Sequence, residues 1–340
     1  MKPQITDHRQ PTTRIDSVDA FRGFTVAAML VVNNPGTWSA IYAPLRHAEW
    51  HGWTPADLIF PFFLFIVGIT TELSRKEPAG IVRRGLLIVL CGVLLNAFPY
   101  FRLGELRFTG VLQRIGIVYI AAALIAWKTS RRTVAIVTAA LLLGYWGVLS
   151  LGPLSPPGAT VAAQVDRAVI PERHLWKQSR TWDPEGILST LPAVATALLG
   201  VLAAPWVRQK KVSMLTIAGA IATAAGLVWG LAFPINKNLW TSSYAVFTAG
   251  AAMLVLALWM RFLPAKPFVV FGVNPLLAFV GSGAMARLLG ISKLQPLSYR
   301  TFFKPYFEPR LASLLWSLAF VLFWYGVLYI LYRRRIFLRL

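Results

Sequence analysis

The sequence predicts an all-α, polytopic integral membrane protein with about ten transmembrane helices. Of its 340 residues, 56% are hydrophobic and 14% are charged, whereas soluble domains are roughly a quarter charged. Apolar runs of about 20 residues, the length that crosses roughly 30 Å of hydrocarbon, recur along the chain. The predicted spans are 18–33, 56–73, 81–98, 110–127, 133–151, 187–206, 214–233, 244–260, 267–288 and 311–332.

The formal net charge of +21 is distributed unevenly among the connections between these spans. Lysine and arginine concentrate in "RKEPAGIVRR", "KTSRR", "VRQKK" and "RRRIFLRL", all on the side of Met1. The positive-inside rule therefore predicts both termini in the cytoplasm. Because topology explains the charge, no nucleic acid is expected as a partner. The predicted organisation is a cytoplasmic segment 1–17, a single transmembrane domain 18–332 and a basic cytoplasmic tail 333–340.

The N-terminal sequence, the cysteine content and the loop lengths limit the possible processing, metal sites and location of chemistry. The first 15 residues are polar, so no cleaved signal peptide is expected and the first span serves as the targeting signal. Cys91 is the single cysteine, which excludes a disulfide within the chain and a cysteine-based metal site. The longest predicted outer loops are 34–55, 152–186 and 289–310. Chemistry is therefore expected at the outer face.

Ionisable and amide side chains within the spans are candidates for function, because an unpaired charge in hydrocarbon costs several kcal/mol. Arg22 follows Asp19 by three positions, which places both on one helix face. A local ion pair and a contact to a cytoplasmic anion are both open for Arg22. Gln113 and Arg114 lie one turn into the fourth span. A structural arginine bonded to loop carbonyls and a cofactor contact are both open there.

The predicted outer loop "PINKNLWTSS" places three amide or cationic donors, Asn236, Lys237 and Asn238, beside the indole of Trp240. This combination suits a sugar or a nucleotide, but it also suits a helix cap with an interfacial aromatic anchor. In "WDPEG", Asp183 also has two roles open to it, because it can contact a ligand or simply start the next helix.

The loop "NNPGTWSAIYAPLRHAEWHGWTPADLIF" is the richest candidate site. If residues 46–51 form a helical turn, His47 and His51 share a face. Zinc would then need Glu49 or Asp57 as a third ligand, and Ala48 stands where the familiar metalloprotease motif has its glutamate, so no metal is expected.

His47 is the best acid–base or nucleophile candidate in the chain. It stands among aromatic residues and beside a carboxylate, a setting that can tune an imidazole to act near neutral pH. Pro35 and Gly36 end the first span, which leaves Asn33 at the outer membrane boundary. Asp57 has two roles open to it: holding the second nitrogen of His47, or capping its own helix.

Six ordered blocks of the chain resemble a known family. "SVDAFRGFTVAAMLVVNN" and "RHAEWHGWTPADLIFPFFLFIVG" are similar to the signature of lysosomal heparan-α-glucosaminide N-acetyltransferase and its bacterial relatives, which are commonly labelled N-acetylglucosamine-related transporters. The similarity continues through "GVLQRIG", "WDPEGILSTLPAV", "PINKNLWTSSYAVFTAG" and "FGVNPLLAFVG", and so covers nearly the whole chain from about residue 15.

The resemblance implies a multi-pass enzyme of the bacterial inner membrane that transfers the acetyl group of cytosolic acetyl-CoA to the amine of a glucosamine-containing sugar on the periplasmic side. It assigns the active-site histidine to His47 and the assisting asparagine to Asn33. Five further positions are carried over to coenzyme and substrate contacts, namely Gln113, Arg114, Asn236, Lys237 and Asn238. Expected partners are acetyl-CoA, an amino sugar, the bilayer and a second copy of the chain.

The chain departs from the family pattern in two ways. We expect no counterpart of the extra N-terminal lumenal domain and span of the lysosomal enzyme, and His51 stands where the family is expected to have asparagine. A transporter of N-acetylglucosamine or chitin fragments is the alternative function, and a structural partner in envelope metabolism is the third.

The expected chemistry places His47 as the base, with Asn33 orienting it or donating to the oxyanion. Transient acetylation of His47 is the competing route. The in-span cations Arg22 and Arg114 are candidates for the coenzyme phosphates. Further substrate contacts are expected from His51, Glu49, Trp50 and Trp240.

Overall fold

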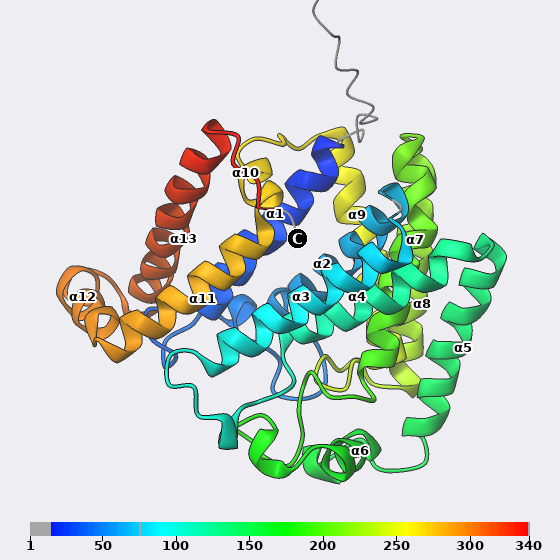
Figure 1. The fold of residues 1–340 in the computed structure, drawn as a ribbon, viewed down its shortest axis with the longest axis horizontal. Helices are drawn as coiled ribbons and strands as arrows, with labels where there is room; N and C mark the ends of the chain where they lie inside the picture. The colour runs from blue at the N-terminus through cyan, green and yellow to red at the C-terminus, as the bar shows by residue number, and fades with distance from the viewer. Residues whose placement is uncertain (1–14, 75, 339–340) are drawn as a thin grey trace, which may run out of the picture.

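The computed structural model describes residues 15–74 and 76–338, and this part of the chain folds into helices with no strand (Figure 1). The predicted N-terminal segment 1–17 therefore falls mostly outside the described residues. The helices are α1 (Asp16–Asn33), α2 (Pro55–Leu73), α3 (Pro78–Ala97), α4 (Val111–Lys128), α5 (Arg131–Leu149), α6 (Val161–Val169), α7 (Thr190–Arg208), α8 (Val212–Ala232), α9 (Ser242–Arg261), α10 (Phe268–Val273), α11 (Pro275–Ile291), α12 (Leu294–Phe302) and α13 (Pro309–Arg333).

The all-α, multi-pass fold class is confirmed, but the count of ten spans is not. Within the described residues, eight helices are long and apolar enough to cross a membrane, or nine if α11 and α12, bent by 82°, form one span. The predicted span 267–288 is broken into α10 and α11 at Asn274. Pro275 explains the break, because its ring removes a backbone donor and disfavours helical geometry in the residue before it. The predicted orientation of the termini stays a prediction.

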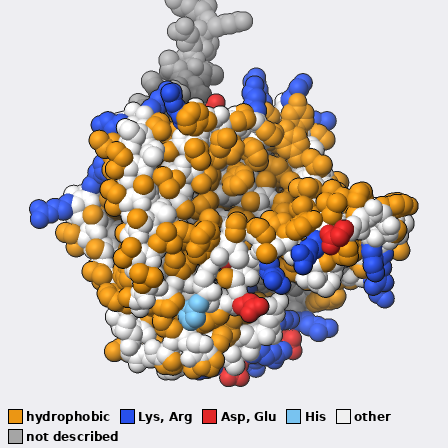
Figure 2. Space-filling model, turned by 180° about the vertical axis from the view of Figure 1, so that it is seen from behind, with side chains coloured by type: hydrophobic (Ala, Val, Ile, Leu, Met, Phe, Trp, Pro, Cys, Tyr) orange, Lys and Arg blue, Asp and Glu red, His pale blue; other side chains and the backbone are white. Residues whose placement is uncertain are grey.

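Central and peripheral helices differ sharply in burial. The apolar window of α7 is 72% buried, whereas that of α8 is 17% buried. Close packing of α7 on α2 depends on glycines: a Cβ on Gly68 would lie 1.8 Å from the carbonyl oxygen of Ala197, and one on Gly200 would lie 2.0 Å from that of Phe65. The peripheral helices expose the apolar surface that covers much of the molecule in Figure 2.

The two ends of the bundle carry different structures. We call the end at which α1 begins and α13 finishes the terminal side, at the top of Figure 1. The opposite end, the loop side, holds the long connections 34–54, 98–110, 150–160 and 170–189 together with the short helix α6. The loop side therefore holds the elements that position the histidine-containing segment.

Candidate active site

His47 is held by Asp57 on the loop side. The segment that carries His47 follows a short turn at Ala43–Leu45, and Asp57 lies in the first turn of α2 with 1% of its side chain exposed. The distance from His47 Nδ1 to Asp57 Oδ1 is 2.8 Å. The other carboxylate oxygen accepts the N–H groups of Ala48, at 3.1 Å, and Thr54, at 3.0 Å. Asp57 therefore performs both roles that the sequence left open, because it holds the imidazole and caps its own helix.

The contact with Asp57 decides which nitrogen of His47 is available for chemistry. An ionised carboxylate only accepts hydrogen bonds, so we assign the tautomer in which His47 donates from Nδ1 to Asp57, the nearer of its two partners, and keeps a lone pair on Nε2. The side chain of His47 is 43% exposed. An oriented imidazole with an accessible free nitrogen can act as a base or a nucleophile.

Lys237 completes this cluster from a distant part of the chain. Its Nζ lies 3.0 Å from His47 Nδ1 and 3.5 Å from Asp57 Oδ1. Burial lowers the pKa of Lys237, while the charges of Asp57 and Glu185 oppose that change. The predicted site residues His47, Asp57 and Lys237 are therefore brought together.

His51 faces a different partner from His47. Residues 46–51 are not helical, which corrects the conditional expectation of a shared helix face. His51 Nδ1 lies 3.4 Å from the amide nitrogen of Asn236, and burial lowers the pKa of His51. Within the described residues, no group of three His, Cys, Asp or Glu side chains is arranged to hold a metal ion.

A cavity of about 490 Å³, which we call the loop-side cavity, lies between α1, α3, α4 and α11. Asn33 and Gln113 both line it. Gln113 is only 4% exposed, and its amide nitrogen has no hydrogen-bond partner within the protein. Because an unpaired buried amide is costly, Gln113 is a candidate donor to a ligand. His47 does not line this cavity, and in the described structure no hydrogen bond joins it to Asn33.

Arg107 links two loop segments beside this cavity. Its Nε donates to Asp183 at 2.9 Å, and its Nη2 donates to Glu185 at 2.6 Å. Asn96 fixes the same loop by donating to the carbonyl oxygens of Arg107 and Thr109. Burial alone would lower the pKa of Arg107, but its bonds to the two carboxylates raise it above its ordinary value. Sequence reasoning missed this arrangement, and the only signal for it was the "WDPEG" block.

Arg114 and Trp240 occupy a packed interior rather than a cavity wall. Arg114 is 1% exposed and donates to the carbonyl of Gly186 and the hydroxyl of Ser189. Its guanidinium lies 5.2 Å from the ring centre of Trp240, whose Nε1 donates to Thr196. These contacts match the structural alternative for Arg114. Arg114 is therefore not brought together with Arg22.

The remaining predicted contacts are spread over the loop side. Trp50 donates from Nε1 to the carbonyl of Leu154 at 2.8 Å and packs edge-on against Trp182. Asn236 is fully buried and accepts the N–H of Leu239 at 2.9 Å, so it shapes the turn that presents Lys237. Glu49 is exposed and Asn238 is half-buried.

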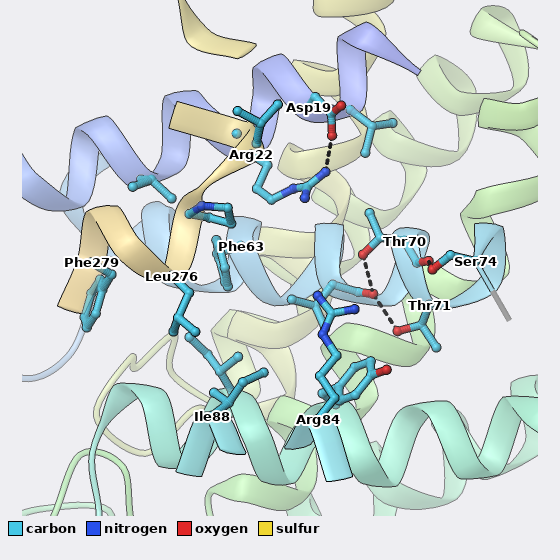
Figure 3. A pocket seen from close by; sticks show the side chains of 18 of the residues that line it. Asp19, Arg22, Phe63, Thr70, Thr71, Ser74, Arg84, Ile88, Leu276 and Phe279 are labelled. Atoms are coloured by element: carbon cyan, nitrogen blue, oxygen red, sulfur yellow. Dashed lines mark hydrogen bonds and ion pairs between the residues drawn. The ribbon is translucent and has the colours of Figure 1, made fainter. Parts of the chain in front are cut away.

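A second cavity, of about 370 Å³, opens on the terminal side. We call it the terminal-side cavity. Figure 3 shows Arg22 of α1 and Arg84 of α3 reaching into it from opposite walls, with Thr70 and Thr71 of α2 between them. Arg22 also forms the predicted ion pair with Asp19.

The two cavities are neighbours within the bundle. Three apolar side chains, Met29, Leu112 and Phe279, line both of them. A cationic pocket on the terminal side and amide donors on the loop side therefore lie on either side of one apolar region. Such an arrangement suits a long ligand with an anionic head and a thin neutral arm.

Comparisons with known proteins indicate the family of this chain. Residues 14–230, more than half of the 340, match the sequence model of the family described as "Heparan-alpha-glucosaminide N-acetyltransferase, catalytic". The chain is 25% identical to the mouse heparan-alpha-glucosaminide N-acetyltransferase over an alignment covering 98% of its length. It is 27% identical to the human protein of the same name over 95% of its length. It spans only 62% and 59% of the lengths of these two relatives.

Proposed function

The chain belongs to the heparan-α-glucosaminide N-acetyltransferase family, and we propose that it is itself a transmembrane N-acetyltransferase. In this proposal it takes the acetyl group of acetyl-CoA on the terminal side and transfers it to the amine of glucosamine or a glucosamine-containing sugar on the loop side. The terminal side faces the cytoplasm and the loop side the periplasm of a bacterial inner membrane. Residues 18–332 form one acyltransferase domain, with a homodimer as the proposed assembly.

The observation that carries this proposal is the placement of a cationic pocket on the terminal side and of amide donors on the loop side in two neighbouring cavities. The three shared lining residues, Met29, Leu112 and Phe279, lie where these cavities are adjacent. The oriented imidazole of His47 lies on the loop side, outside both cavities.

The terminal-side cavity is a better candidate site for acetyl-CoA than the surroundings of Arg114, because Arg114 lines neither cavity. Arg22 and Arg84 offer charge-assisted donors for the phosphate groups, and Thr70, Thr71 and Ser74 line the same space with hydroxyl groups. The apolar junction has the chemistry to hold the pantetheine arm. When bound, acetyl-CoA supplies the activated acyl group as a thioester.

The residues of the loop side supply the acid–base chemistry. A glucosamine amine attacks only after it has lost a proton, and Nε2 of His47 takes that proton. Asp57 stabilises the resulting imidazolium and fixes the ring. The amine nitrogen bonds to the acyl carbon, and the amides of Asn33 and Gln113 are donors for the oxyanion that forms there. Collapse of this oxyanion breaks the C–S bond of the thioester, and CoA leaves as the thiol with the proton that His47 took from the amine. Acetylation of His47 itself with loss of CoA, followed by transfer to the amine, is the competing route.

The adjacency of the two cavities also favours a second function. Neighbouring cavities, of which the loop-side one is lined by amides, are what a transporter of N-acetylglucosamine or chitin oligosaccharides would need. Such a transporter would move the sugar without consuming acetyl-CoA.

The proposal is tested with purified protein in liposomes that enclose radiolabelled acetyl-CoA, with glucosamine or small amino-sugar oligomers outside. Wild type should transfer the label to the sugar, and His47→Ala should reduce transfer by about 10²- to 10⁴-fold. His174→Gln is the matched control, because His174 is a buried loop-side histidine that contacts the Leu106 carbonyl and lines neither cavity. Saturable uptake of N-acetylglucosamine without any acetyl transfer would instead establish the transporter.

A further inference from the structure

The last described residues return to the helix bundle instead of leaving it. We call residues 334–338 the C-terminal strap. After α13 the chain reverses at Arg335, whose φ of 57° is the left-handed conformation common at helix ends. The N–H of Ile336 then donates to the carbonyl of Leu331 at 2.9 Å. In Figure 1 the red end of the chain passes from the top of α13 to the region of α10.

Asn274 holds the C-terminal strap through both ends of its side-chain amide. Its Nδ2 donates to the carbonyl of Ile336 at 3.0 Å, and its Oδ1 accepts the N–H of Leu338 at 2.9 Å. Asn274 is 1% exposed and occupies the break between α10 and α11. Both polar groups of this buried amide are bonded to the main chain of the last described residues. These bonds fix a segment that would otherwise fray.

The C-terminal strap forms part of the wall of the terminal-side cavity. Leu338 lines this cavity together with Val273 and Pro275, the two neighbours of Asn274. Arg22 and Arg84 line the same cavity. The break between α10 and α11 therefore performs two tasks, because its flanking residues shape the pocket and its asparagine brings the strap to that pocket.

From these contacts we propose that the C-terminal strap is a component of the acetyl-CoA site and that Asn274 is the positioning residue that holds it there. This inference rests on the proposed function, since it assigns the donor to the terminal-side cavity. Asn274 does not line the cavity itself, so it acts through the strap. With the strap in place, Leu338 covers one side of the cavity and slows the departure of the bound donor.

The test measures the dissociation constant of CoA and the steady-state constants of full-length protein and two variants. Asn274→Asp keeps an acceptor for the Leu338 N–H but cannot donate to the Ile336 carbonyl. A chain ending after Arg335 removes Leu338 and preserves α13. Both changes should raise the Kd of CoA and the KM for acetyl-CoA about tenfold, with the KM for the amino sugar unchanged. Ile330→Val is the control, because Ile330 is an exposed residue of α13 that lies outside the strap and lines neither cavity.

A second measurement tests, without using catalysis, whether CoA shields the strap from solvent. In a Cys91→Ser background, Leu338→Cys provides a single thiol, and CoA should slow its reaction with a maleimide at least fivefold. The role of the strap alone would be overturned by three results together. Wild type would bind CoA and transfer acetyl groups, both variants would keep the Kd of wild type, and CoA would not protect the thiol at position 338. Wild type that neither binds CoA nor transfers acetyl groups would overturn the proposed function together with the inference.

Discussion

The loop-side cluster and the terminal-side cavity are built by opposite means. Around His47, short contacts fix the ring and the neighbouring backbone, and Asp57 alone accepts from a histidine ring, two backbone N–H groups and a hydroxyl. The terminal-side cavity instead brings long cationic side chains from separate helices around about 370 Å³ of space. The difference matches the proposed tasks, because proton transfer requires fixed geometry whereas a large donor requires room and charge.

The largest expected effect is the loss of kcat in the loop-side variant Asp57→Asn. The amide oxygen can keep the bonds to Ala48 and Thr54, which directs the amide nitrogen at His47 Nδ1. The histidine must then accept at Nδ1 and carry its proton on Nε2, where it cannot act as a base. We expect kcat to fall by about 10²- to 10⁴-fold, with the KM for acetyl-CoA changed less than about threefold. Steady-state kinetics in liposomes measures both, and a kcat within about twofold of wild type would contradict the assignment of the base.

The loop side should also be the region that loses more stability when a single cation is removed. Arg107→Met leaves Asp183 and Glu185 without their partner in a buried setting, where breaking an ion pair costs about 3–5 kcal/mol. Thermal unfolding in detergent should show a clear decrease in Tm. Arg84→Met on the terminal side is the comparison, and an equal decrease there would show that the loop side is not the more rigidly organised region.

An intermediate effect on donor binding is expected from the terminal-side cations. Arg22→Gln and Arg84→Gln should each raise the KM for acetyl-CoA about tenfold, because each removes a charge-assisted contact to phosphate. The increase should diminish at high ionic strength, since salt screens the wild-type attraction. Arg208→Gln is the control, as Arg208 is an exposed terminal-side cation that lines neither cavity. An equal effect of Arg208→Gln would assign the KM change to general surface charge.

The smallest effect on catalysis is expected from Lys237. Lys237→Gln removes a cation that lies 3.0 Å from His47 Nδ1 and 3.5 Å from Asp57 Oδ1, but it leaves the contact between His47 and Asp57 in place. We therefore expect kcat/KM to fall by less than about tenfold. A loss as large as that expected for Asp57→Asn would contradict this order of effects.

The stability of Lys237→Gln should depend less on pH than the stability of wild type does, because the variant lacks the ionisable group of Lys237. The pKa of Lys237 is lowered by burial from 10.5, so the folded protein loses this proton at a lower pH than the unfolded chain does. The contribution of Lys237 to stability therefore rises with pH between its folded pKa and 10.5. Tm measured across this range should rise less in Lys237→Gln than in wild type, and parallel curves would show that burial does not lower the pKa of Lys237.

The sequence predicted those features that depend on nearby residues. Apolar runs of membrane length indicated the helices, and Asp19 and Arg22 were paired because a helix places positions three apart on one face. The importance of His47 and Asp57 came from a single short segment and from its resemblance to a family. The break at Asn274 was missed although Pro275 was visible, because the surrounding run is apolar enough to pass for one span.

By itself, the sequence determined an all-helical membrane fold, the segment that carries the candidate base and the family to which the chain belongs. Only the tertiary structure decided which distant groups meet: Lys237 reaches His47 across 190 positions, and Arg107 reaches Asp183 across 76. It also separated Arg22, on a cavity wall, from Arg114, in a packed interior. The physical reason is that helix formation depends on local periodicity, whereas the pairing of charges depends on how whole helices pack, which no local pattern specifies.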